Sequence, residues 1–273
     1  MDASQLSDIL LSLTSRADKD AEKAIRSYLR KPTCVLGLCE QVGGAEAPQV
    51  RQLAAVLLRK KINSYWSRMG AHQEAIKAGL LSALMSEQLS VVRKAIANVI
   101  AALSKHLVPM GGWDELLALI NEAAVSADKD HRHMAMLLLL LLTEVLGKHM
   151  SKQFGALAEL YQNCLRDPED GAVRTMALRA LTALVEFLAG GDEVVHFREL
   201  VPDMLNVARQ CIETGDVPAA TMVRVLWLYG GVGGVGGGAV WVWARGGGYG
   251  GVGCVVYSAR MVCEYGVRLC VLV

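Results

Sequence analysis

Aromatic residues and prolines are scarce in this sequence. Of its 273 residues, 5% are aromatic and six are proline, whereas 53% are hydrophobic. β-Sandwiches and barrels are built from many short strands joined by turns rich in glycine and proline. The composition therefore favours packed helices over a sandwich or a barrel, in a chain long enough to bury a large core.

Net charge is also nearly absent. The 28 basic and 27 acidic residues leave a formal charge of +1. Proteins that are drawn to nucleic acid or to an anionic membrane carry a surplus of lysine and arginine. We therefore expect no direct binding to nucleic acid and no association with a membrane.

Long apolar runs are missing as well. Residues 134–146 form 13 largely apolar residues, whereas a helix that spans a bilayer needs about 20. This run predicts a buried helix of a soluble fold. The start of the chain, Met1-Asp2, lacks the basic start and apolar run of a secretory signal, so we interpret it as the start of the mature protein.

The seven cysteines contain no CxxC pair. An odd number without such pairs favours reduced thiols of the cytosol or nucleus over a disulfide framework. Cys34 and Cys39 have no histidine or second cysteine pair nearby, so they are expected to be buried thiols. His131 and His133 would point about 200° apart on a helix and cannot face one metal ion. We predict no metal site.

Signatures of catalysis are lacking too. The sequence contains no GxSxG elbow, HExxH pair, Walker A motif or kinase signature. Gly231, Gly233 and Gly236 match the GxGxxG spacing, but no βαβ unit frames them, and the surrounding residues are so rich in glycine that a match is expected by chance. The chain is therefore not expected to be an enzyme or to bind a cofactor.

What the sequence does contain is a series of helical segments with a 3.6-residue apolar period, which come in pairs. The first members of the pairs are expected at residues 3–14, 33–42, 71–86, 113–126, 152–166 and 193–214. The second members are expected at residues 21–31, 49–66, 90–107, 131–148 and 172–188. The sequence therefore predicts an all-α fold of helical hairpins.

An arginine recurs near the start of the second helices. Arg51, Arg93, Arg132 and Arg174 lie 42, 39 and 42 residues apart. This period is that of HEAT and armadillo arrays and excludes tetratricopeptide and ankyrin repeats, whose periods are about 34 and 33 residues. HEAT repeats are favoured because each unit has two long helices. The alternative is a single irregular helical bundle in which the spacing is accidental.

Two of the second helices are each expected to bury one stripe of side chains and to present a polar stripe to solvent or a partner, whereas the helix at 131–148 is apolar all round and is expected to be covered on several sides. In residues 49–66 the inward side chains are predicted to be Val50, Leu53, Ala54, Leu57 and Leu58. In residues 90–107 they are Val92, Ile96, Val99, Leu103 and Leu107. The polar stripes consist of Gln52, Arg59 and Asn63 in the first helix and of Lys94, Asn98 and Lys105 in the second. The basic cluster Arg59-Lys60-Lys61 would form a solvated face or meet an acidic patch of another protein.

The last fifty residues differ from the rest. Residues 223–273 contain no lysine or aspartate, a single glutamate and 14 of the 27 glycines. Such a composition cannot sustain a helix or a defined core. We predict an α-solenoid of about five and a half HEAT repeats over residues 1–222, followed by an irregular tail at residues 223–273. This tail is expected to be disordered or an aberrant product of a translated intron or shifted reading frame.

The segment from Pro48 to Trp66, which reads PQVRQLAAVLLRKKINSYW, resembles the N-terminal signature of the importin-β (karyopherin-β) family of nuclear transport receptors. The resemblance covers roughly residues 1–222. It implies a HEAT superhelix that shuttles between cytoplasm and nucleus with protein cargo. It also implies binding of the GTPase Ran in its GTP state at the second helices and of Phe-Gly nucleoporins at grooves between first helices.

Carried over to this chain, the resemblance implies that Ran is bound by the two polar stripes. The implied contacts are Gln52, Arg59, Asn63, Lys94, Asn98 and Lys105. Apolar slots for Phe-Gly nucleoporins would lie near Leu119, Leu157 and Leu160. A complete receptor of this family has many more repeats downstream. The alternative function is a HEAT-repeat scaffold or assembly adaptor that does not bind Ran.

Overall fold

A computed structural model describes residues 1–15, 18–188 and 192–214, and these residues form α-helices and short 3₁₀ helices without a strand. This confirms the all-α fold class. The tail at residues 223–273, its GxGxxG match and its three cysteines lie outside the described residues. Two compact units divide the chain, at Met1–Leu116 and Leu117–Val273, and each is described by itself.

The first unit contains three helical hairpins. Their α-helices are α1 (Ala3–Ser15), α2 (Lys19–Tyr28), α3 (Cys34–Gly44), α4 (Pro48–Tyr65), α5 (Gln73–Ser86) and α6 (Ser90–Leu107). Short 3₁₀ helices η1 (Trp66–Arg68), η2 (Gly70–His72) and η3 (Val108–Met110) occupy the connections that follow α4 and α6. Helix α7 (Asp114–Ala124) contains the boundary between the two units.

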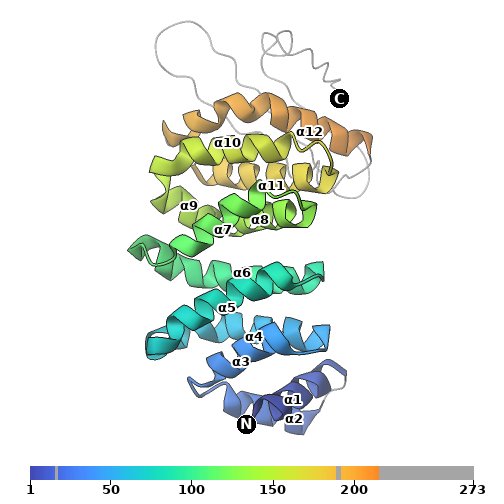
Figure 1. The fold of residues 1–273 in the computed structure, drawn as a ribbon, viewed down its shortest axis with the longest axis vertical. Coiled ribbons are helices and arrows are strands. Elements are labelled where there is room, and N and C mark those ends of the chain that lie inside the picture. Colours follow the sequence, from blue (N-terminus) through green and yellow to red (C-terminus); the bar gives the residue numbers. More distant parts are fainter. Residues whose placement is uncertain (16–17, 189–191, 215–273) are drawn as a thin grey trace, which may run out of the picture. The chain divides into compact units, whose positions relative to one another are not determined.

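Successive hairpins of the first unit pack in two layers (Figure 1). The first helices α3 and α5 contact each other, and so do the second helices α4 and α6. Inside each hairpin α3 packs on α4, and α5 packs on α6. Because α3 and α4 each contact both their hairpin partner and their counterpart in the next repeat, their apolar stripes join into one core, which is how HEAT-type repeats are stabilised.

The second unit repeats this arrangement. Its helices are α8 (Lys129–Leu141), α9 (Thr143–His149), α10 (Phe154–Leu165), α11 (Gly171–Leu188) and α12 (Val201–Glu213), with η4 (Ser151–Gln153) before α10 and η5 (Asp192–Leu200) before α12. The second helix α11 packs on α8 and α9, and α10 packs on α11 and α12. The leucine-rich run of α8 is buried from Met134 to Leu139, as its all-round apolar character predicts.

The recurring arginines join one repeat to the next. In the first unit, Arg51 of α4 donates to both carboxylate oxygens of Glu87, at 2.7 and 3.2 Å, and to the carbonyls of Ala45 and Glu46. Arg93 of α6 donates twice to the Glu87 carbonyl, at 3.0 and 2.7 Å. One acidic residue at the end of α5 therefore anchors two second helices.

The same junction recurs in the second unit. Arg132 of α8 donates to the carboxylate of Asp167, in the turn after α10, and to the carbonyls of Ser126 and Ala127. Arg174 of α11 donates to the Asp167 carbonyl at 2.7 Å. The arginines that the sequence aligned are thus equivalent in three dimensions, which favours tandem repeats over an irregular bundle.

Two predicted helices are interrupted. The segment expected at 131–148 breaks at Leu142, after which the Thr143 hydroxyl donates to the Leu140 carbonyl at 2.7 Å and competes with the helical bonding pattern. The segment expected at 193–214 is a 3₁₀ helix up to Leu200 and an α-helix only from Val201. Pro202 explains the second break, because proline favours the first turn of a new helix and disfavours a helical residue before it.

None of the helices in the described ranges is long and apolar enough to cross a membrane.

Candidate protein-binding surface

Helix α4 presents the first predicted polar stripe. Arg59 and Asn63 are exposed, and Gln52 is half-buried. The Asn63 amide donates to the carbonyl of Ala102 in α6 at 3.2 Å. Proline at the first position of α4 fixes where this helix begins, and hence which side chains face outward.

Helix α6 presents the second stripe. Lys94 and Lys105 are exposed, and Asn98 is half-buried with its amide donating to the Lys94 carbonyl at 2.7 Å. The five predicted inward residues of this helix are all buried. Since α4 packs on α6, the two stripes belong to neighbouring helices of one layer. We name Gln52, Arg59, Asn63, Lys94, Asn98 and Lys105 the α4–α6 polar surface.

The basic cluster of α4 is split by the packing. Arg59 and Lys60 are exposed, whereas Lys61 is half-buried. Burial raises the pKa of the Cys34 thiol in α3, and the charge of Lys61 partly offsets this rise. Within the described residues, Arg59 and Lys94 have no ion-pair partner, so both charges are available to another molecule.

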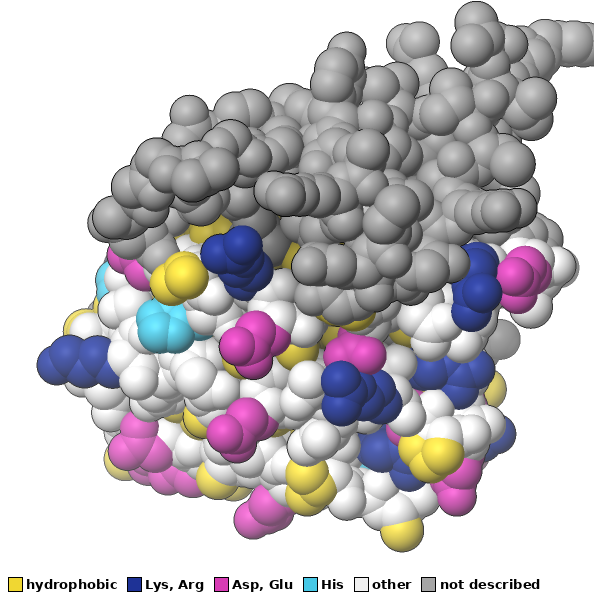
Figure 2. Space-filling view, turned by 90° about the horizontal axis from the view of Figure 1, so that it is seen from above, with side chains coloured by type: hydrophobic (Ala, Val, Ile, Leu, Met, Phe, Trp, Pro, Cys, Tyr) yellow, Lys and Arg dark blue, Asp and Glu magenta, His cyan; other side chains and the backbone are white. Residues whose placement is uncertain are grey.

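Charges of both signs are interspersed on the visible part of one face of the protein. The face shown in Figure 2 carries acidic and basic side chains side by side and no large field of one sign. A mixed surface of this kind provides specific pairings with a protein partner and little general attraction to a polyanion. It agrees with the nearly neutral composition of the sequence.

A small apolar groove lies between the first helices α3 and α5. Its volume is about 170 Å³. The lining residues include Leu36, Cys39, Ile76, Gly79 and Leu80. No atom lies within 4 Å of the position that a Cβ of residue 79 would take, so Gly79 leaves open space at the groove. Sequence reasoning missed this groove, because the pairing of α3 with α5 brings together residues about forty positions apart.

The slots expected near Leu119, Leu157 and Leu160 differ from this groove. Leu157 and Leu160 are buried in α10, and Leu119 is half-buried in α7. Buried leucines are already packed and offer little surface to a ligand. The apolar groove between α3 and α5 is therefore the better candidate for binding an aromatic side chain of another molecule.

The junction acids are the other residues that sequence reasoning missed. Burial raises the pKa of Glu87, but hydrogen bonds from Arg51 and from the amides of Leu89 and Gln88 outweigh burial and hold it below its ordinary value. The signal for finding Glu87 and Asp167 was present, because each acid lies six or seven residues before a recurring arginine. Among the described residues, no group of three or more His, Cys, Asp or Glu could hold a metal ion.

Two family models match this chain. Residues 21–102 match the importin-beta N-terminal domain, and residues 88–226 match IPO5-like TPR repeats. Together they cover most of the described residues. The two matches overlap at residues 88–102, which contain most of α6.

Curated relatives agree with these matches. The chain is 34% identical over 207 residues to the probable importin subunit beta-4 of Schizosaccharomyces pombe, which covers 75% of this chain and 19% of the relative. It is 28% identical over 222 residues to importin-4 of Homo sapiens, which covers 81% of this chain and 20% of the relative. The chain thus spans about a fifth of the length of these relatives.

Solved structures show the same fold. The structure of Kap121p bound to Nup53p matches with a TM-score of 0.68 and 21% identity, over 81% of this chain and 22% of that chain. Kap121p bound to Pho4p matches with the same score and identity. With two hairpin layers, recurring arginine junctions and both family models in agreement, this chain belongs to the importin-β family of nuclear transport receptors.

Proposed function

We propose that this chain is the N-terminal portion of a nuclear import receptor that binds Ran in its GTP state, Phe-Gly nucleoporins and protein cargo. The observation that carries the proposal is the α4–α6 polar surface, which keeps charged side chains exposed on two neighbouring second helices of an importin-β N-terminal domain. Kap121p, which shares the fold, is bound to Nup53p in one structure and to Pho4p in another. A receptor with these partners shuttles between cytoplasm and nucleus.

Ran-GTP is the partner proposed for the α4–α6 polar surface. Arg59 and Lys94 supply two exposed positive charges, and Gln52, Asn63 and Asn98 supply amide groups beside them. Charged groups at the rim of an interface determine association rate and specificity, while neighbouring amides fix the orientation by hydrogen bonds. The second helices therefore offer the chemistry that an acidic and polar face of a globular partner requires.

The test compares Ran loaded with a non-hydrolysable GTP analogue and Ran loaded with GDP on the immobilised full chain, by surface plasmon resonance. We expect clear preference for the GTP state. The double variant Arg59→Glu, Lys94→Glu is expected to weaken that binding by about tenfold or more, since each reversed charge repels the partner. Lys152→Glu, at an exposed lysine of the second unit, is the matched control. Equal binding of both nucleotide states, or none, would support the alternative of a HEAT scaffold or adaptor without Ran binding.

The groove between α3 and α5 is proposed as a nucleoporin slot. Its volume of about 170 Å³ and its apolar lining suit one phenylalanine side chain. A labelled peptide of Phe-Gly repeats is expected to bind, and a Ser-Gly peptide of equal length is expected not to bind. Gly79→Leu fills the groove without a backbone clash and should abolish the difference between the two peptides. Gly155→Leu, at a glycine with equally open surroundings in α10, is the control, and equal loss in both variants would contradict the assignment.

A further inference from the structure

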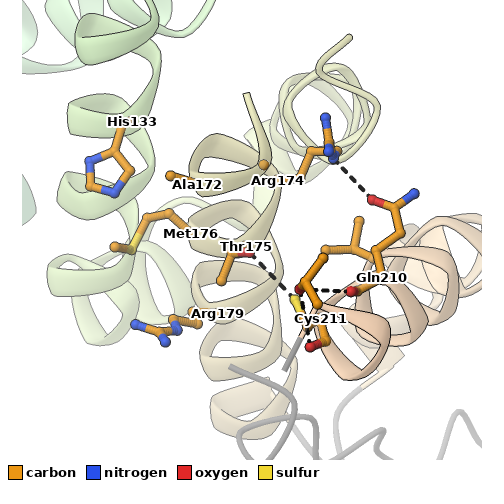
Figure 3. A pocket seen from close by; sticks show the side chains of 11 residues that line it. His133, Ala172, Arg174, Thr175, Met176, Arg179, Gln210 and Cys211 are labelled. Atoms are coloured by element: carbon orange, nitrogen blue, oxygen red, sulfur yellow. Dashed lines mark hydrogen bonds between the residues drawn. The ribbon is translucent and has the colours of Figure 1, made fainter. Parts of the chain in front are cut away.

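A second, larger pocket lies in the second unit and is lined by residues of α8, α11 and α12 (Figure 3). Its volume is about 350 Å³. Helix α8 contributes His133, helix α11 contributes Arg174, Thr175 and Arg179, and helix α12 contributes Gln210 and Cys211. None of the described residues that line this pocket is acidic, so its polar groups are amide, hydroxyl, thiol and basic side chains.

Arg174 lacks the acidic partner that Arg51 and Arg132 have. Arg51 bonds a carboxylate 36 residues further along the chain, and Arg132 bonds one 35 residues along. The residue 36 positions after Arg174 is Gln210, whose side-chain carbonyl accepts from Arg174 Nε at 3.2 Å. A neutral amide accepts the hydrogen bond but leaves the guanidinium charge uncompensated.

Arg179 has even fewer partners. Its Nε is buried without a hydrogen-bond acceptor among the described residues. No ion pair to an acidic side chain is found for Arg179 among the described residues, so its charge, like that of Arg174, has no acidic partner. In Figure 3, Arg174 and Arg179 leave α11 in different directions, and Met176 lies between His133 and Thr175. The rest of the lining carries no charged side chain apart from His133 when it is protonated.

The uncharged residues of the pocket favour one kind of anionic ligand over another. Ala172, Met176 and Val207 add apolar surface, and the Thr175 hydroxyl lies 3.4 Å from the Cys211 sulfur. A free phosphate would gain nothing from apolar side chains, whereas an acidic residue beside an apolar one would use both parts of the pocket. We propose that this pocket binds a peptide segment of a partner protein that carries an aspartate or glutamate next to an apolar side chain.

The test uses the full chain and a fluorescein-labelled peptide of sequence Gly-Leu-Glu-Leu-Glu-Gly, with fluorescence anisotropy as the readout. A copy with glutamine in place of both glutamates should bind at least about tenfold more weakly, because a hydrogen bond to a charged group is stronger than one to a neutral group. Arg179→Gln should cause a similar loss, and Arg179→Lys should restore part of it. Arg209→Gln, at an exposed arginine of α12 that pairs with Glu213, should change nothing. Unchanged circular dichroism would verify that each variant is folded.

Three outcomes would overturn the proposal. Equal binding of the two peptides, or an Arg209→Gln effect as large as that of Arg179→Gln, would show that the pocket is not the site. Displacement by inorganic phosphate or by oligouridine at the peptide's own concentration would indicate a bare-anion or RNA site. The Ran test concerns the first unit, so failure of either proposal leaves the other standing.

Discussion

Arg132 in α8 and Asp167 in the turn after α10 form a bidentate ion pair, in which the arginine Nε and Nη2 donate to the two carboxylate oxygens. The Asp167 side chain is 2% exposed and that of Arg132 is 11% exposed. The carboxylate also accepts from the amides of Glu169 and Asp170. This pair therefore fixes the start of α11 against α8.

We expect Arg132→Ala to lower the free energy of unfolding by about 3 kcal/mol, because removing one partner leaves the other charge buried and unpaired. Urea denaturation followed by circular dichroism measures this loss. Lys129→Ala is the control, since Lys129 is 63% exposed and lies 3.7 Å from Asp170. Its loss should stay below about 1 kcal/mol. Equal losses in the two variants would contradict the importance assigned to the buried pair.

Acid should destabilise the protein through the same junctions. Burial raises the pKa of Asp167, but the hydrogen bonds from Arg132 and from two amides outweigh burial and hold it below its ordinary value. A carboxyl whose pKa is lowered in the folded state contributes stability above its unfolded pKa and loses it as pH falls through its folded pKa. We expect the urea concentration at the unfolding midpoint to be nearly constant around neutral pH. It should decrease when the pH drops below 3.8, the ordinary pKa of aspartate. Asp167→Asn should have a flatter profile in that acidic range, and an unchanged slope would argue against this account.

Gly37 in α3 is a site of close approach. A Cβ at this position would overlap the Tyr28 hydroxyl and stand 3.3 Å from a methyl group of Leu6. We expect Gly37→Ala to destabilise the first unit by about 1 to 3 kcal/mol, the usual cost of overpacking. Removing the hydroxyl with Tyr28→Phe should restore part of that loss in a thermal melt. Gly43→Ala, in the same helix with no atom near its Cβ, should be neutral or slightly stabilising.

Cysteine reactivity should report on the groove region. Burial raises the pKa of Cys39 to about 12 and that of Cys164 to about 11, so the thiolate is scarce at neutral pH in both. Iodoacetamide at pH 8 should alkylate Cys39 and Cys164 much more slowly in the native protein than in urea. Mass spectrometry of the digested protein measures both rates. Rapid native labelling of Cys39 would indicate that α3 and α5 separate in solution.

The periodic features of the sequence predicted most of the fold. The inward residues of α6 are all buried, and the arginine spacing identified the junctions between repeats. The prediction for α4 was partly wrong, since Leu53 and Leu57 are half-buried while Ala55 and Ile62 are fully buried. Helix α4 contacts α1, α3 and α6, so its buried face is rotated away from the stripe that the apolar pattern favoured.

Features that depend on distant residues were not predictable in this way. Glu87 and Asp167 each precede a recurring arginine by six or seven residues, but the arginines that bind their carboxylates, Arg51 and Arg132, lie 36 and 35 residues earlier in the chain. The expected buried thiol at Cys34 is confirmed, and Cys39 is half-buried at the groove. The exposure of Arg59, Lys94 and Lys105 is confirmed, while their role in binding Ran stays a prediction.

The side-chain bonds between repeats described above join residues 35 to 39 positions apart. Each junction can therefore close as soon as the next forty residues have left the ribosome, without waiting for distant parts of the chain. Folding of this kind proceeds in steps along the polypeptide, and local contacts of this type favour rapid assembly. Under mechanical tension the same bonds should break one after another. When the tension is released, each should form again quickly, because its two residues are close in the sequence.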